Sequence, residues 1–159
     1  MLWLLGEVVR VQACKGTGLH AIETEDTAIA LLEFANGALG VLQASTAAYP
    51  GYPRRVEITG SEGTVILEHD RVLAVDLLNP PEGFHQNVAP DENQSASSPV
   101  VGDFRGHQAL IEDFLHAIEA NTAPICDGLE GRRSLALVEA IYRAAERKPA
   151  QSPASAPKR

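Results

Sequence analysis

The sequence predicts an α+β fold, in which a mostly antiparallel open sheet of about six strands carries two C-terminal helices on one face. Short segments rich in β-branched residues fill the first half of the chain, and two segments with helical spacing follow in the second half. Between two apolar runs lies Asn36-Gly37, a pair whose tolerance of positive φ suits a tight hairpin turn. Because the strands precede the helices instead of alternating with them, the helices are expected to gather on one sheet face.

Size and charge narrow the classes of partner. The chain has 159 residues, enough for one globular domain with a core of its own. Its formal net charge of -8 repels phosphate backbones, and no stripe of Lys and Arg overrides that repulsion, so no nucleic acid is expected as a partner. No membrane is expected either, because the apolar opening at residues 1–6 is far shorter than a span or a signal core. Cys14 and Cys126 form no CxxC pair, which favours a reducing compartment, the cytoplasm.

The strands are expected in the first half of the chain. Residues 8–13 alternate β-branched and polar side chains, the period of a half-buried strand. Residues 26–34 and 39–46 form the hairpin through Asn36-Gly37. Three more strands, separated by turn residues, are expected at residues 54–59, 64–68 and 71–77.

A long loop and two helices follow. Residues 79–103 are rich in Pro, Ser, Asn and Gly, which predicts a loop. The first helix ends near Asn121, and its apolar stripe consists of Leu110, Ile111, Phe114, Leu115 and Ile118. The second helix begins at Asp127, which forms a capping box with Glu130. Its buried stripe is expected to be Leu135, Val138, Ile141, Tyr142 and Ala145.

Both faces of the predicted hairpin are apolar. Ala30, Leu32 and Phe34 point to one side, and Ile29 and Leu31 point to the other. A face in contact with water should be polar instead. We therefore expect the helices to cover one face, and a second copy of the chain or another domain to cover the other.

Residues 16–21 match the dinucleotide-binding pattern G-x-G-x-x-A after a predicted strand. A true fingerprint opens a helix, whose positive end holds the pyrophosphate. Here Glu23, Glu25 and Asp26 crowd that position with negative charge, and the next run pairs as a hairpin. The sequence favours an ordinary connection between strands.

No metal or nucleophile pattern is visible. The five histidines, at positions 20, 69, 85, 107 and 116, show no H-E-x-x-H spacing. Neither cysteine has an evident basic context, and there is no G-x-S-x-G motif. We predict no metal ligand, no catalytic nucleophile and no cofactor-binding residue in this chain, while an acid/base pair of carboxylates stays open.

Four stretches resemble, in order, the C-terminal domain of the glucose–fructose oxidoreductase/inositol dehydrogenase/MocA (Gfo/Idh/MocA) family. The most characteristic is Glu25-Asp-Thr-Ala-Ile-Ala-Leu-Leu-Glu-Phe-Ala-Asn-Gly-Ala-Leu-Gly-Val-Leu-Gln-Ala-Ser45. The other three lie at residues 3–11, 56–64 and 107–124. Together the four span nearly the whole range from Leu2 to about Arg147.

The resemblance implies an oxidoreductase that transfers hydride between NAD or NADP and a sugar or polyol. Residues 1–147 would be its substrate-side and dimerisation domain, truncated at the N-terminus, with residues 148–159 as a disordered tail. The implied N-terminal Rossmann domain, its catalytic lysine and the Asp-x-x-x-His motif that would lie just before the first strand are not present in this sequence. Residues 1–6 are then the last turn of a helix that begins outside the chain. We expect a homodimer or higher homo-oligomer through the sheet face.

Two residues correspond to family positions that face the substrate. Tyr52 precedes the strand at residues 54–59, and His107 heads the first long helix. Both side chains can hydrogen-bond sugar hydroxyls. The alternatives are a tyrosine that shapes a Tyr-Pro-Gly-Tyr-Pro turn and a histidine that packs at a helix entry. For the chain as a whole, the alternative is a non-catalytic dimerisation or binding module derived from the same family.

Overall fold

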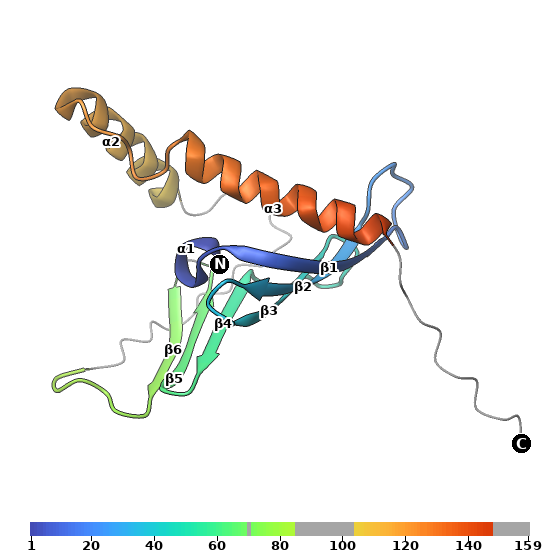
Figure 1. Cartoon of the computed structure of the whole chain (residues 1–159), viewed down its shortest axis with the longest axis horizontal. Helices are drawn as coiled ribbons and strands as arrows, with labels where there is room; N and C mark the ends of the chain where they lie inside the picture. Colours follow the sequence, from blue (N-terminus) through green and yellow to red (C-terminus); the bar gives the residue numbers. More distant parts are fainter. Residues whose placement is uncertain (70, 85–103, 148–159) are drawn as a thin grey trace, which may run out of the picture. The chain divides into compact units, whose positions relative to one another are not determined.

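The computed structural model describes residues 1–69, 71–84 and 104–147 (Figure 1). The elements are α1 (Leu2–Leu5), β1 (Val8–Gly16), β2 (Thr27–Phe34), β3 (Leu39–Ser45), β4 (Arg55–Gly60), β5 (Gly63–Glu68), β6 (Arg71–Leu77), α2 (Arg105–Ala120) and α3 (Gly128–Glu146). The predicted tail at 148–159 and most of the predicted loop at 79–103 lie outside the described residues. The predicted α+β class is confirmed, and the part of the chain that the structure describes contains six antiparallel strands and two C-terminal helices.

The six strands are divided between two sheets of three, in the orders β1-β2-β3 and β4-β5-β6. The chain accordingly forms two compact units. Among the described residues, the first unit contains residues 1–47 and 104–147, and the second contains residues 48–69 and 71–84. The sequence predicted six strands correctly but gave no sign of where one sheet ends and the next begins.

The predicted hairpin is confirmed in the first unit. Gly37 has a φ of 88°, a conformation that glycine adopts without strain. The side-chain oxygen of Asn36 accepts a hydrogen bond from the Ala38 N–H at 3.0 Å, which closes the turn. The tight turn fixes the register, so that Leu31 pairs with Val41 across β2 and β3.

The core of the first unit lies on one face of this sheet. Ala30, Leu32 and Phe34 of β2 are buried there, and α3 runs along β1 over the same face (Figure 1). Leu137 and Ile141 of α3 pack against these buried residues. Complete burial of a side chain such as that of Leu32 contributes about 1.5–3 kcal/mol.

The predicted stripe of α3 needs one correction. Leu135 and Val138 were expected to be buried, but both are exposed. The sheet is covered instead by the neighbouring side of the helix, which carries Leu137 and Ile141. The helix start is confirmed, because the Asp127 carboxylate accepts N–H bonds from Leu129 and Glu130 at 2.9 and 3.0 Å. The Glu130 carboxylate pairs with the Arg133 guanidinium at 2.7 Å rather than completing a capping box.

Helix α2 starts before the predicted stripe and ends where predicted. Asn121 caps it in the left-handed conformation, with a φ of 52°. Among the described residues of α2, Ala117 alone is buried, and the whole apolar stripe is exposed.

No helix among the described residues combines the length and the apolar character needed to cross a membrane.

The second unit is an antiparallel meander, in which neighbouring atoms leave no room for a side chain at Gly63. This residue pairs with Gly60 and with Leu77, and its φ is 157°. A Cβ atom at Gly63 would lie 2.3 Å from the carbonyl oxygen of Asp76 and 2.8 Å from Cδ2 of Leu77. Only glycine fits there without a shift of the backbone.

Replacing Gly63 with alanine is therefore expected to lower the free energy of unfolding by about 1–3 kcal/mol. Urea denaturation followed by circular dichroism measures the change. Gly60→Ala is the matched control, because the nearest atom to its added Cβ is 3.8 Å away. Equal unfolding midpoints for the two variants would contradict the steric argument.

Candidate functional site

The segment that resembles a dinucleotide fingerprint connects two antiparallel strands. The backbone N–H groups of Gly18, Leu19 and His20 converge on Oδ2 of Asp26, at 2.9, 2.7 and 3.1 Å. The Asp26 side chain is almost completely buried, and these amides, first that of Leu19, hold its pKa far below the usual aspartate range. A carboxylate of the chain itself thus occupies the place where a phosphate would bind. The interpretation as a strand connection is confirmed.

The same connection is attached to α3 by one long-range contact. The Tyr142 hydroxyl donates a hydrogen bond of 2.5 Å to Oε1 of Glu25. This bond lowers the pKa of Glu25 and raises the pKa of Tyr142. The Lys15 ammonium lies 4.4 Å from the centre of the Tyr142 ring, a cation–π contact. A tyrosine with a raised pKa stays protonated at neutral pH. The contact between Tyr142 and Glu25 therefore suits a structural role, in which it attaches the strand connection to α3, better than a role as an acid/base pair.

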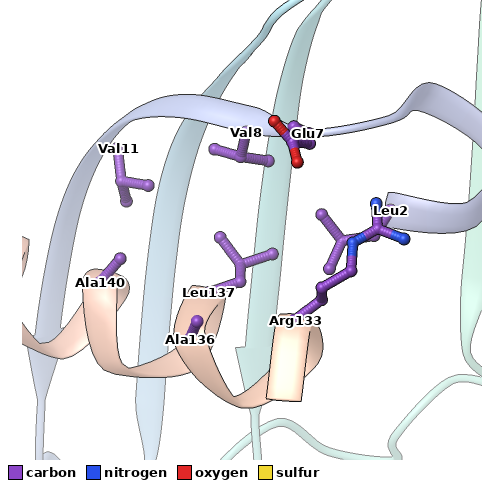
Figure 2. A pocket seen from close by; sticks show the side chains of 8 residues that line it. All are labelled: Leu2, Glu7, Val8, Val11, Arg133, Ala136, Leu137 and Ala140. Carbon is purple, nitrogen blue, oxygen red and sulfur yellow. The ribbon is translucent and has the colours of Figure 1, made fainter. Parts of the chain in front are cut away.

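A hollow of about 230 Å³ lies between α1, the start of β1 and α3 (Figure 2). Its lining combines apolar side chains with one acid and one base: Leu2, Glu7, Val8, Val11, Arg133, Ala136, Leu137 and Ala140. The Arg133 guanidinium is already paired with the Glu130 carboxylate. The hollow offers apolar contact and a charge of each sign, which suits packing better than catalysis.

The other face of the β1-β2-β3 sheet is exposed and apolar at its centre. Leu31 and Val41 are 50% and 66% exposed although they are direct cross-strand neighbours. Ile29 and Leu39 extend the same apolar area along β2 and β3. Toward β1 the apolar area ends at a polar pair. The Arg10 guanidinium of β1 and the Glu33 carboxylate of β2 form an ion pair of 2.6 Å. We call these four apolar residues together with this ion pair the open sheet face.

The structure places the two predicted substrate residues in different units. Tyr52 lies in the segment before β4, in the second unit, and its side chain is 83% exposed. His107 lies in the first turn of α2, in the first unit, and is also exposed. Both are accessible to a ligand, and their role in substrate binding stays a prediction. Among the described residues, no group of three or more His, Cys, Asp or Glu side chains is placed to hold a metal ion.

Two features of the site were not predicted. The role of Asp26 had a visible signal, because an acid directly before a strand and after a glycine-rich turn is placed to accept turn amides. The contact between Tyr142 and Glu25 spans 117 positions, and no local pattern points to it.

Comparison with known proteins gives consistent matches. Residues 1–66 match the GFO/IDH/MocA C-terminal domain family. A myo-inositol 2-dehydrogenase of Thermotoga maritima is 29% identical over 128 residues, which cover 77% of this chain and 35% of that protein. An inositol 2-dehydrogenase of Rhizobium meliloti is 26% identical over 129 residues, again 77% of this chain and 35% of that protein. The chain thus spans about a third of the length of these curated relatives.

Solved structures agree with the sequence matches. The WlbA dehydrogenase from Bordetella pertussis, solved in complex with NADH and UDP-GlcNAcA, is 27% identical, with a TM-score of 0.71 over 92% of this chain and 39% of that one. The UDP-N-acetylglucosamine 3-dehydrogenase GnnA from Acidithiobacillus ferrooxidans is 28% identical, with a TM-score of 0.63 over 92% of this chain and 43% of that one. By its sequence and its fold, this chain is similar to the C-terminal domains of the GFO/IDH/MocA oxidoreductase family.

Proposed function

We propose that this chain is the substrate-side and oligomerisation domain of an NAD(P)-dependent oxidoreductase that acts on a sugar or polyol. One observation carries the proposal. The chain matches the WlbA dehydrogenase over 92% of its own length but covers only 39% of that enzyme, which was solved with NADH and a nucleotide sugar. The curated relatives are dehydrogenases of inositol, a polyol. A polyhydroxylated substrate is the chemistry that these relatives have in common.

The dinucleotide has to be bound by residues outside this chain. A pyrophosphate needs free backbone amides at the start of a helix. In the fingerprint-like segment the amides of Gly18, Leu19 and His20 are taken by Asp26, and a strand follows instead of a helix. The residues present there do not fit NAD or NADP. We therefore propose that the lone chain is inactive and works with a separate nucleotide-binding half.

The open sheet face is proposed as the surface of a homodimer. An apolar area on a sheet face needs a cover, and an isologous contact between two copies provides one with a single surface. The Arg10–Glu33 ion pair at the edge gives the face a polar rim, as in protein interfaces whose centre is apolar. We also propose a reducing compartment, the cytoplasm, because Cys14 and Cys126 are both free and exposed.

Joining the chain to the nucleotide-binding part of the Thermotoga maritima relative tests the function. The joined protein is expected to bind NADH and to reduce NAD or NADP with at least one member of a panel of inositols, hexoses and nucleotide sugars. The lone chain, titrated with NADH and followed by NADH fluorescence, is expected to show no saturable binding below a millimolar. A joined protein that binds NADH but oxidises no member of the panel would favour the non-catalytic module instead.

Tyr52 and His107 are expected to act on substrate binding rather than on the hydride step. In the joined protein, Tyr52→Phe and His107→Ala should each raise KM by roughly 5- to 15-fold, because each removes one hydrogen bond worth about 1–1.5 kcal/mol. The value of kcat should change less than KM. Steady-state kinetics of the two variants and of Tyr49→Phe, a neighbouring exposed tyrosine, measure the effect. Unchanged KM in both variants would support their roles in the turn and at the helix entry.

A further inference from the structure

The open sheet face is bounded by different chemical groups at its two ends along the strands. At one end the Arg10 guanidinium and the Glu33 carboxylate form their ion pair. At the other end the hydroxyls of Thr27 and Ser45 lie 3.0 Å apart across β2 and β3. The extended strand between Thr27 and Glu33 spans about 20 Å. One end is therefore ionic, and the other is a pair of neutral hydroxyls.

Between these ends the face is apolar along β2. Alternate side chains of a strand point to the same face, so the β2 residues on this one are Glu33, Leu31, Ile29 and Thr27. Each of them lies beside its cross-strand partners on β1 and β3, so the face consists of four rows that run across the sheet. Leu31 and Ile29, in the two middle rows, are 50% and 44% exposed. The rows change from ionic through apolar to hydroxyl along the strands.

Two copies that pack through this face with aligned sheets can be related by a two-fold axis in either of two directions. An axis that runs along the strands, over β2, places each row on the same row of the second copy. The Glu33 carboxylate would then face Glu33 of the second copy, across sheets about 10 Å apart. Arg10 would lie over Leu39 of the second copy and would gain no acidic partner. Like charges that face each other across an interface oppose this orientation.

An axis that runs across the strands, between the rows of Leu31 and Ile29, reverses the order of the rows. The row of Leu31 then lies on the row of Ile29 of the second copy, so apolar side chains meet at the centre. The row of Glu33 lies on the row of Thr27, where the carboxylate faces hydroxyls that can donate hydrogen bonds. The two Glu33 carboxylates are then about 20 Å apart, well beyond the screening length of about 8 Å in physiological salt.

We propose that the open sheet face binds a second copy of this chain with the strands of the two sheets antiparallel. The Arg10–Glu33 end of each copy then lies on the Thr27–Ser45 end of the other. The inference rests on the proposed function, which assigns this face to a homodimer, and adds the orientation of the two copies. The apolar rows provide the buried area, and the two polar ends select one orientation over the other.

Cross-linking of introduced thiols tests the orientation. Cys14→Ser/Cys126→Ser is the starting variant, because it removes both native thiols. Leu39→Cys/Ser45→Cys, added to it, places one thiol in each end row on β3. In the antiparallel orientation, position 39 of one copy faces position 45 of the other. A short bismaleimide that bridges facing sheets, about 10 Å apart, should therefore convert most of this variant into a covalent dimer.

The matched controls are the two single variants, Leu39→Cys and Ser45→Cys, in the same starting variant. Each should give little covalent dimer, because its two thiols lie about 20 Å apart in the antiparallel orientation. The same distance along β3 prevents the linker from joining positions 39 and 45 within one copy. Thr27→Cys probes the opposite orientation, because its thiol would face its own counterpart only if the two-fold axis ran along the strands. Thr27→Cys should therefore also give little covalent dimer.

Light scattering before cross-linking separates this inference from the proposed homodimer. Efficient cross-linking of Thr27→Cys overturns the antiparallel orientation and leaves the homodimer intact. The same conclusion follows if Leu39→Cys/Ser45→Cys has the mass of a dimer but gives no covalent dimer. A wild-type chain that is monomeric at tens of micromolar overturns the homodimer and the orientation together.

Discussion

Replacing Leu31 and Val41 together with glutamate is expected to convert a dimer of this chain into a monomer. The two side chains pair across β2 and β3 at the centre of the open sheet face, and neither belongs to the core. In a dimer built on that face, four carboxylates would lose water without gaining a partner, which costs far more than surface substitutions do. The dissociation constant should rise by more than about 100-fold, equivalent to about 2.8 kcal/mol.

Light scattering after gel filtration, at tens of micromolar protein, measures the change as a halved molar mass. Leu129→Glu is the control, because it also exchanges an exposed leucine for an acid but lies in the first turn of α3. Circular dichroism should be the same for the wild type and both variants. A monomeric wild-type chain, or a double variant that keeps the dimer mass, would show that another surface or another domain covers this face.

The hairpin of the first unit could be predicted because all of its determinants are local. Asn36-Gly37 specifies the turn, the turn fixes the register, and the alternation along β2 assigns Leu32 to the core and Leu31 to the open face. The cap of α3 was predictable for the same reason, since Asp127 binds amides only two and three residues away.

Features that depend on distant pairing could not be predicted. The separation of β4 from the first sheet leaves no mark in composition, because a turn between sheets and a turn within one use the same residues. In α3, apolar residues lie on more than one side, so helical periodicity alone could not decide between Leu135 with Val138 and Leu137 with Ile141. The sheet selects the second pair. The resemblance to the family named Tyr52 and His107, and the structure adds that both are exposed.

Asp26 is expected to give the fold an acid-sensitive component of stability. Its carboxylate accepts N–H bonds from Leu19, His20 and Gly18, which lower its pKa, and the His20 imidazole Nδ1 lies 3.6 Å from the same oxygen. Because the pKa is lower in the folded chain, the folded chain binds this proton less readily than the unfolded chain does. The stabilisation is therefore complete above the ordinary aspartate value of about 3.9 and is lost as the pH falls below it.

Asp26→Asn is expected to lower the midpoint of thermal unfolding at neutral pH by on the order of 5 °C, because it keeps the shape but replaces charge-assisted hydrogen bonds with weaker neutral ones. Asp26→Ala, which leaves three amides without an acceptor, should have about twice the effect. The difference between the wild type and the asparagine variant should shrink steadily between about pH 4 and pH 2.5, where the carboxyl of the unfolded wild-type chain binds its proton while that of the folded chain stays ionised. Thermal unfolding followed by circular dichroism across this range measures it. Glu23→Gln, an exposed acid of the same connection, is the control and should match the wild type at every pH. If the difference in unfolding midpoint between Asp26→Asn and the wild type stayed constant down to the lowest pH, the charge of Asp26 would not stabilise the connection between β1 and β2.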